Sequence, residues 1–448
     1  MTGGNNVDVT ELIDHQKLGG LQLRMFLLGA IAMCVDGFDL QVLGFAAPAA
    51  TRGLGLAPGA LGIAFAATGF GTLLGNLAFA PLSDHIGRKP VILICLAFFG
   101  FCSLATAAAG SLVALAWLRF ATGLGLGGLM PTMCAVVAEY TPRRLRVTFL
   151  GLIWLGFGIG AGSGGVVTAL ILRDYSWQGV FVFGSLLPFL LIPVMAWFLP
   201  ESLQTLVRRN APHKRLSRIA TRLKLLSQSA EPSAFLTSEQ KEKGVPVTLL
   251  FRDGRARLTI LLWVAFFSCL MTNYFLSSWL PTIVSNAGVS EETAIVISGL
   301  LHLGAFINAL IILPSCERFK ICFEFLVVAF FIGALGTAAI GLAGGDPLTV
   351  TIAIIAAGLF VFGAQTMLNA IAASVYPSAM RSTGSGWALG IGRIGQIIGP
   401  WIGGYLLSLH WSGNHILYVA GLSPIIGGIA ALLLLSPGRR LQPALSTT

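Results

Sequence analysis

The sequence predicts an all-α integral membrane protein with twelve transmembrane helices in two pseudo-symmetric bundles of six. Three observations predict this fold class. Hydrophobic residues make up 55% of the 448 residues and charged residues only 10%, with a mean hydropathy of +0.84, whereas soluble proteins carry about 25% charged residues. The second observation is that long segments contain no charged residue. The third is that glycine-rich and loop patterns of the first half recur in the second half. The composition excludes a soluble enzyme, a nucleic-acid-binding protein and a disordered chain.

The charge-free segments predict where the helices lie, because a helix needs about 20 apolar residues to cross roughly 30 Å of hydrocarbon. Strands of a membrane barrel would alternate over about ten residues, and these segments do not alternate. Turn residues divide them into twelve spans. The predicted spans are residues 24–48, 60–82, 90–110, 112–137, 147–172, 177–199, 258–282, 293–314, 324–344, 348–375, 384–408 and 413–436.

One long connection organises the chain. Residues 201–257 carry twelve Lys and Arg but no span, so they separate six helices from six. We therefore expect five parts. These are a cytoplasmic N-terminal segment at 1–23, an N-terminal bundle at 24–200, a cytoplasmic linker at 201–257, a C-terminal bundle at 258–436 and a cytoplasmic tail at 437–448.

Basic residues predict the orientation. With the N-terminus in the cytoplasm, the cytoplasmic side holds 24 of the 28 Lys and Arg, the outer connections hold Arg52 and Arg173, and the spans hold Arg119 and Arg393. This asymmetry is typical of inner-membrane proteins with both termini in the cytoplasm. The positive charge then faces anionic lipid rather than nucleic acid. The seven cysteines form neither a disulfide framework nor a CxxC metal site.

The two halves share small-residue patterns. G-xxx-G-A-xx-G-G begins at Gly156 in the fifth span, and G-xxx-G-P-xx-G-G begins at Gly395 in the eleventh, an offset of 239. The loops around Asp84 and Glu317 match at an offset of 233. Two matches at nearly one offset indicate duplication. Glycines four residues apart let helices pack closely, and we expect these two spans to slide or rock.

Short motifs resemble those of a known family. Residues 84–89, Asp-His-Ile-Gly-Arg-Lys, resemble the D-x-x-G-R-[RK] signature of the major facilitator superfamily, and Arg119 with Gly123 and Gly127 resembles its fourth-helix motif. Residues 36–39, Asp-Gly-Phe-Asp, resemble the D-G-[FY]-D motif of its aromatic acid/proton symporter family. In that group Pro-Glu-Ser, here residues 200–202, is also usual after the sixth helix. The resemblance covers residues 20–437 and implies uptake of aromatic acids with protons.

The sequence departs from the family pattern at two places. Lys320 stands where Gly87 would recur in the second-half copy of the loop signature. Ala161 stands in place of the proline that many antiporters have in the fifth helix, which disfavours an exporter.

Charged residues inside the membrane are candidates for proton coupling, since each costs at least about 2.5 kcal/mol there. Asp36 and Asp39 lie on one helix face, and a proton on one would relieve their repulsion. The resemblance implies the same role for this motif. Arg119 is expected to pair with one of them, in a tuning or a purely structural role. Glu139 lies beside the arginines at 143–146, where a gating salt bridge is favoured over proton transfer.

Arg393, near the centre of the eleventh span, is the candidate for binding a substrate carboxylate, because its planar fork forms two parallel hydrogen bonds. The alternative is an ion pair with Asp36 or Asp39. An aromatic acid would also need flat apolar walls and polar partners for ring hydroxyls. The further candidates are Phe38, Asn273, Tyr274, Gln365, Asn369 and Trp387, and for the aromatic ones the alternative is core packing or lipid contact. His302 is expected to be a packed neutral histidine, with proton transfer as the alternative.

The loop with Asp84, Gly87, Arg88 and Lys89 is expected to act as a gate. Gly87 permits a tight turn and Arg88 can bridge helix ends. The resemblance implies that this loop locks the two halves in the outward-open state.

These features predict a proton-coupled symporter that imports small organic anions, of the benzoate or hydroxybenzoate type, and not an enzyme. There is no GxxxxGK[ST] motif, so we expect no cofactor and a proton gradient as the energy source. The expected partners are the aromatic acid, protons and membrane lipids, and we expect a monomer. The alternatives are a sugar or polyol carrier, a drug/proton antiporter, and a membrane protein without a transport function.

Overall fold

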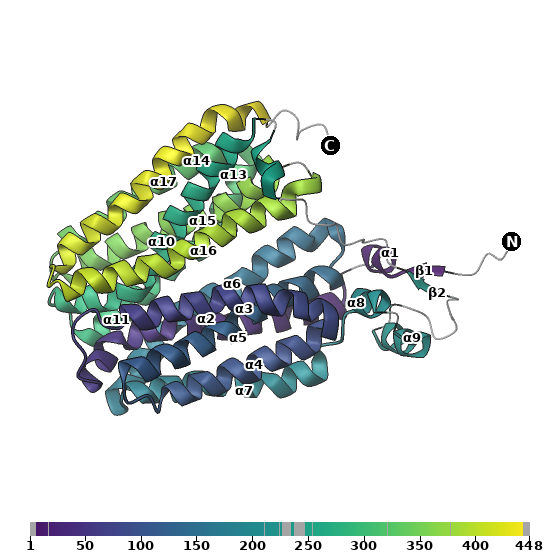
Figure 1. The fold of residues 1–448 in the computed structure, drawn as a ribbon, viewed down its shortest axis with the longest axis horizontal. Helices are drawn as coiled ribbons and strands as arrows, with labels where there is room; N and C mark the ends of the chain where they lie inside the picture. The colour runs from purple at the N-terminus through teal and green to yellow at the C-terminus, as the bar shows by residue number, and fades with distance from the viewer. Residues whose placement is uncertain are drawn as a thin grey trace.

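The computed structural model is almost entirely helical over the residues that it describes (Figure 1). Those residues are 6–16, 18–209, 211–223, 225, 234–236, 247–252, 254–319, 321–376 and 378–441. The first half and the linker contain β1 (Asn6–Asp8), α1 (Val9–Asp14), α2 (Gly20–Gly53), α3 (Gly62–Ile86), α4 (Arg88–Thr106), α5 (Leu112–Tyr140), α6 (Arg143–Asp174), α7 (Trp177–Phe198), α8 (Leu203–Arg208), α9 (His213–Arg222) and β2 (Ala234–Leu236), which pairs in parallel with β1.

The second half begins with a 3-10 turn, η1 (Val247–Phe251). It continues with α10 (Ala256–Asn286), α11 (Glu291–Gly299), η2 (Leu300–His302), α12 (Leu303–Ile307), η3 (Asn308–Ile312), α13 (Leu313–Phe319), α14 (Cys322–Leu342), α15 (Pro347–Val375), α16 (Ser378–Ser408) and α17 (Gly413–Leu441). The last helix extends past the predicted end of its span at residue 436. Lys320 lies outside the described residues.

Eleven helices or joined helices of the described residues are long and apolar enough to cross a membrane. They match eleven of the twelve predicted spans. The remaining span, predicted at 384–408, is the 31-residue helix α16, which lies alongside the others (Figure 1). Its mean hydropathy is lower because it holds Arg393, Gln396 and many glycines. The predicted class, an all-α membrane protein, is confirmed.

The eighth span is a broken helix rather than the continuous one expected at 293–314. A 3-10 turn at Leu300–His302 and a π-helical turn at Asn308–Ile312 interrupt it. Here the chain lies against α15 at backbone distance, since a Cβ on Gly304 or Gly358 would collide with the backbone of the other element. Irregular turns of this kind inside membrane helices often accompany function.

The shared glycine patterns serve the same purpose in each half. A Cβ on Gly160 of α6 would collide with the carbonyl of Cys34 in α2, and a Cβ on Gly399 of α16 would collide with that of Met271 in α10. In both halves, therefore, the fifth helix packs backbone to backbone on the first. The equivalence supports the predicted duplication.

The two halves meet at one end of the molecule and diverge at the other, where both termini, α8 and α9 lie (Figure 1). One apolar core cluster contains residues of both halves, including Phe65 of α3 and Trp279 of α10, whose rings are 5.2 Å apart. Two further clusters belong to single halves, one to residues 9–235 and one to residues 250–434. We call the end at which the two halves share a core the closed end, and the end at which their helices diverge the open end.

Polar contacts also join the halves at the closed end. Arg52 pairs with Glu291 at 2.5 Å, and Arg173 pairs with Glu292. Both arginine side chains are more than half exposed, so these pairs stabilise the closed end only weakly. Close backbone packing matters more, because a Cβ on Gly404 of α16 would lie 2.5 Å from the carbonyl oxygen of Gly59 and 2.9 Å from Cα of Gly62.

Gly404→Ala is expected to hold the closed end apart. Overpacking costs about 1–3 kcal/mol, which lowers the population of the closed arrangement by roughly 5- to 150-fold. Spin labels on cysteines placed at residues 52 and 291 report the separation of the halves, and we expect longer distances in the variant than in a protein with the same labels and Gly404.

Gly386→Ala provides the matched control on the same helix, since a Cβ on Gly386 has no atom within 4 Å. It should leave the label distances unchanged. Equal distances in the Gly404→Ala protein would show that this contact does not control closure.

Candidate functional site

A buried ion pair joins α2 and α5 in the interior of the first half. Nη1 of Arg119 donates to Oδ1 of Asp39 at 2.9 Å, and Nη2 donates to the backbone oxygen of Asp39 at 3.0 Å. The two side chains are 0% and 1% exposed. The guanidinium also lies over the ring of Phe181, 5.7 Å from its centroid. Asp39 is therefore held by Arg119, a pairing that both roles considered for this arginine, tuning and purely structural, required.

Asp36 has a different environment. It is 1% exposed, and its Oδ1 has no hydrogen-bond partner among the described residues. Its carboxyl interacts electrostatically with Arg393 of α16 and with Asp39. Of the two predicted proton carriers, Asp36 is the one whose carboxyl has no hydrogen-bonding cation and can change its charge without breaking an ion pair.

Arg393 of α16 is 8% exposed. Its Nη1 donates to Oε1 of Gln396 at 3.0 Å, while its Nε has no partner among the described residues. Tyr274 of α10, which is half-buried, interacts electrostatically with both Arg393 and Asp36. Asp36, Arg393 and Tyr274, which come from three helices and both halves, thus interact electrostatically. This arrangement combines a guanidinium that has an unused hydrogen-bond donor with a carboxyl that can bind a proton.

A second polar pair lies on α10 and α15. Nδ2 of Asn273 donates to Oε1 of Gln365 at 2.6 Å. Asn273 precedes Tyr274 in the chain and is 2% exposed, whereas Gln365 is half-buried. Asn369 lies one helical turn beyond Gln365 towards the open end and is exposed.

Two predicted site residues lie elsewhere. The ring of Phe38 is 3% exposed and packs on Phe183, 5.8 Å away, and over Gly184 of α7. Trp387 stacks on Trp263 at 6.0 Å. It is six residues from Arg393 on α16, which places the two on different helix faces. These neighbours correspond to the alternative of core packing or lipid contact that the sequence left open for the aromatic candidates.

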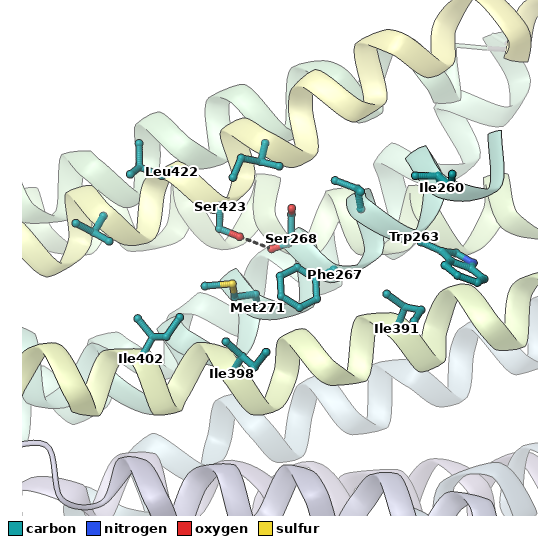
Figure 2. Close-up of a pocket in the computed structure, with 13 residues that line it drawn as sticks. Ile260, Trp263, Phe267, Ser268, Met271, Ile391, Ile398, Ile402, Leu422 and Ser423 are labelled. Carbon is teal, nitrogen blue, oxygen red and sulfur yellow. Dashed lines mark hydrogen bonds between the residues drawn. The ribbon is translucent and has the colours of Figure 1, made fainter. Parts of the chain in front are cut away.

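Trp263 lines an apolar groove beside α16 (Figure 2). The groove has a volume of about 580 Å³ and lies between α10, α16 and α17. Isoleucines of α16 that share the face of Trp387, among them Ile391 and Ile398, line it. This face is therefore suited to lipid contact rather than to binding an acid.

A buried hydrogen bond that the sequence analysis missed joins the halves near the closed end. The amide nitrogen of Gln41 in α2 is 3.2 Å from Nε2 of His302 in the broken eighth span. Gln41 is 6% and His302 is 2% exposed. Because the amide nitrogen can only donate a hydrogen bond, this contact requires His302 to accept through an unprotonated ring nitrogen, which is consistent with the predicted packed, neutral histidine. A glutamine within an apolar span, five residues after Asp36, was the available signal.

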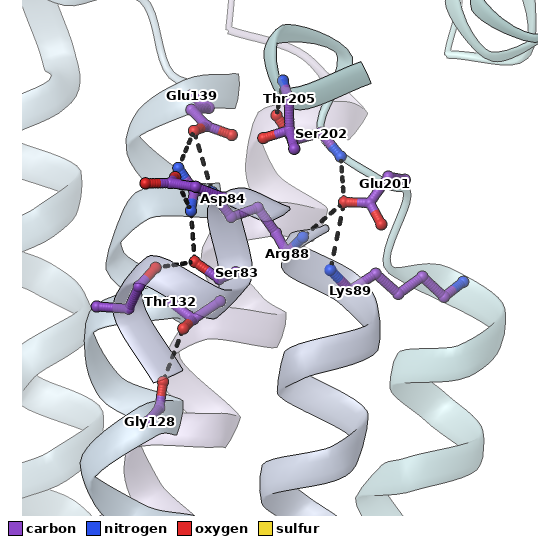
Figure 3. Close-up of polar contacts among 11 residues, drawn as sticks. Ser83, Asp84, Arg88, Lys89, Gly128, Thr132, Glu139, Glu201, Ser202 and Thr205 are labelled. Atoms are coloured by element: carbon purple, nitrogen blue, oxygen red, sulfur yellow. Dashed lines mark hydrogen bonds and ion pairs between the residues drawn. The ribbon is translucent and has the colours of Figure 1, made fainter. Parts of the chain in front are cut away.

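The loop between α3 and α4 forms a dense polar network within the first half (Figure 3). Arg88 is central. Its Nη1 lies 2.6 Å from Oδ1 of Asp84, and its Nη2 lies 3.1 Å from Oε1 of Glu139 at the end of α5. Glu139 thus forms a salt bridge with the loop that is expected to act as a gate.

Glu201 attaches the same loop to the segment after α7. Its Oε1 accepts from the backbone nitrogens of Arg88 at 2.9 Å and of Lys89 at 3.3 Å, at the N-terminus of α4 (Figure 3). Gly87 has φ +110°, and a Cβ there would lie 2.5 Å from Oε2 of Glu201. The backbone angle requires glycine. The nitrogen Nζ of Lys89 donates to the carbonyl of Ala196 at 2.5 Å.

Glu201→Ala should lower the free energy of unfolding by about 1–3 kcal/mol, because it leaves backbone donors of α4 without their acceptor. Glu201→Gln keeps an oxygen acceptor and loses only the charge at the helix N-terminus, which is worth about 0.3–1 kcal/mol. Thermal unfolding in detergent should therefore rank the wild type above Gln and Gln above Ala. An unchanged midpoint for the alanine variant would contradict the assigned role.

Comparisons with known proteins add to this geometry. A family model described as Major Facilitator Superfamily matches residues 29–388. The gallate transporter of Pseudomonas putida is 34% identical over 427 residues, which cover 95% of this chain and 94% of that protein. The 4-hydroxybenzoate transporter PcaK of Pseudomonas aeruginosa is 34% identical over 430 residues, 95% of each. The crystal structure of nucleoside transporter NupG is similar in fold, with a TM-score of 0.68 at 14% identity, covering 93% of this chain and 99% of that chain.

Proposed function

Since the chain belongs to the Major Facilitator Superfamily, we propose that it imports small aromatic carboxylates together with protons, by alternating access between its two halves. The named substrates of the relatives, gallate and 4-hydroxybenzoate, support an aromatic acid. The observation that carries the proposal is Arg393, nearly buried, with Nε unpartnered and Asp36 within electrostatic range.

An arginine in this position favours an anionic substrate over the alternatives. A sugar or polyol carrier needs no buried cation, and a drug exporter that moves cations would be hindered by one. Burying Arg393 costs free energy, and an incoming carboxylate offsets that cost by forming charge-assisted hydrogen bonds. Tyr274 lies beside the same cation and can contact the ring of the acid.

Proton coupling follows from the energetics of anion uptake. An inside-negative potential opposes anion entry by about 2.3 kcal/mol per charge per 100 mV, so one proton per monoanion makes the cycle electroneutral. Asp36 is the proposed carrier. When its carboxyl is protonated, Arg393 loses that competing charge and binds the substrate carboxylate. Asp39 is paired with Arg119 and holds α2 on α5. The energy source is the proton gradient, without a cofactor.

We propose that the open end faces the cytoplasm, because the basic residues gather there. The protein is then an inner-membrane protein with both termini inside, and this structure is its inward-open state. To open outward, the halves must part between Gln41 and His302 and between Arg52 and Glu291. In that outward-open state, the loop around Arg88 would hold the two halves together at the cytoplasmic end. We further propose that the protein acts as a monomer and that membrane lipids surround it.

Uptake by the purified protein in liposomes tests the function. With an alkaline interior, labelled 4-hydroxybenzoate should accumulate, and a protonophore should abolish the accumulation. A sugar, a nucleoside and a lipophilic cation should not accumulate. Accumulation that resists the protonophore would refute proton coupling, and failure to take up any aromatic acid would refute the proposed substrate class.

Asp36→Asn is expected to uncouple transport from the proton gradient. The amide is always neutral and resembles the protonated carboxyl, so exchange of labelled for unlabelled acid should persist while accumulation driven by the pH gradient falls to background. Asp174→Asn, at the exposed end of α6, is the control and should accumulate the acid normally. Gradient-driven accumulation by the Asp36→Asn protein would exclude Asp36 as the carrier.

A further inference from the structure

We propose that the Asn273–Gln365 pair selects aromatic acids that carry a ring hydroxyl over those that lack one. The inference rests on the proposed function, since it concerns the ring end of an acid whose carboxylate binds Arg393. It adds a specificity determinant that the charged residues cannot supply, because they recognise any carboxylate alike.

The hydrogen bond between the two amides fixes their orientation. Nδ2 of Asn273 donates to Oε1 of Gln365 at 2.6 Å, and the same nitrogen lies 3.8 Å from Sγ of Cys269. With its oxygen occupied, Gln365 is left with its amide nitrogen, a donor, on a side chain that is only half-buried. Asn273 acts as the positioning residue, since it determines which end of the Gln365 amide is presented.

The pair also has an unused acceptor. Oδ1 of Asn273 is buried and has no hydrogen-bond partner among the described residues, and its side chain is 2% exposed. A buried polar atom without a partner costs free energy that a ligand can recover. Together the two amides leave one acceptor, Oδ1 of Asn273, and one donor, Nε2 of Gln365.

A phenolic hydroxyl matches this combination, because it donates one hydrogen bond and accepts another. A ring hydrogen can do neither. Tyr274, the next residue after Asn273, interacts with both Arg393 and Asp36, so the amide pair and the proposed carboxylate site are adjacent along α10. A site built to bind a hydroxyl rejects the analogue that lacks it, because the buried amide groups then stay unpaired.

The test compares uptake of labelled 4-hydroxybenzoate, 3-hydroxybenzoate and benzoate by the full-length protein in liposomes. The wild type should favour at least one hydroxybenzoate over benzoate in kcat/KM by roughly 5- to 150-fold. In Asn273→Leu and Gln365→Met, which keep the shape but remove the polar atoms, that ratio should fall to within about twofold of unity.

Thr366→Val is the matched control. Its hydroxyl is next to Gln365 on α15 but donates to the carbonyl of Phe362 in its own helix, so the substitution should leave the ratio unchanged. If both amide variants keep the wild-type ratio, or if the wild type takes up benzoate as efficiently as the hydroxybenzoates, the inference is wrong while the proposed function stands. If the wild type takes up no aromatic acid, the proposed function has failed.

Discussion

Replacing Arg119 with leucine is expected to abolish transport and to lower the stability of the folded protein by about 3–5 kcal/mol, the cost of leaving one buried charge without its partner. Arg119 donates to the carboxylate and to the backbone of Asp39, and neither side chain is more than 1% exposed. If the guanidinium is removed, water cannot reach the buried carboxylate of Asp39 to take its place. We expect a reduced yield of monodisperse protein and a lower midpoint of thermal unfolding.

A double variant separates folding from function. In Asp39→Leu with Arg119→Leu both charges are gone, and replacing a buried pair by apolar groups is often neutral for stability. The double variant should therefore regain much of the thermal stability lost by Arg119→Leu, yet it should remain inactive in liposome uptake. Restored uptake in the double variant would show that the pair has only a structural role.

Arg393→Ala is expected to reduce uptake of aromatic acids by roughly 30- to 4,000-fold. The range follows from about 2–5 kcal/mol for removing one partner of a desolvated charge pair, at about 1.4 kcal/mol per tenfold change. Folding should be affected less than in Arg119→Leu, because Arg393 bonds only to Gln396 among the described residues. The effect should appear in both KM and the maximal rate measured in proteoliposomes.

Arg393→Lys distinguishes charge from geometry. Lysine keeps the charge but cannot form the two parallel hydrogen bonds of a guanidinium, so its uptake should lie between those of the wild type and the alanine variant. Arg257→Ala, an exposed arginine on α10, controls for loss of positive charge and should transport normally. Normal uptake by Arg393→Ala would move the carboxylate site elsewhere in the protein.

The polar residues of the site were predictable to different degrees. Asp36, Asp39, Arg119 and Arg393 were apparent because charge is expensive in hydrocarbon, so each one in an apolar span is conspicuous. Asn273 and Gln365 were weaker candidates, because an uncharged amide in an apolar span is less costly than a charge and therefore less conspicuous. For Phe38 and Trp387 the sequence left the role open, since aromatic rings are compatible with a binding site, a core or lipid. Gln41 was overlooked although it bonds to His302.

The linear chain by itself determined the membrane class, the order of the helices, the duplication and the polar loop at residues 84–89, because each depends on local composition and spacing. Only the tertiary structure decided that Asp39 pairs with Arg119 while Asp36 faces Arg393, that Asn273 orients Gln365, and which end is closed. Those outcomes depend on how each helix is rotated about its axis and crosses its neighbours. Rotation and crossing are set by side-chain packing between segments far apart in the chain, and hydropathy carries no record of that packing.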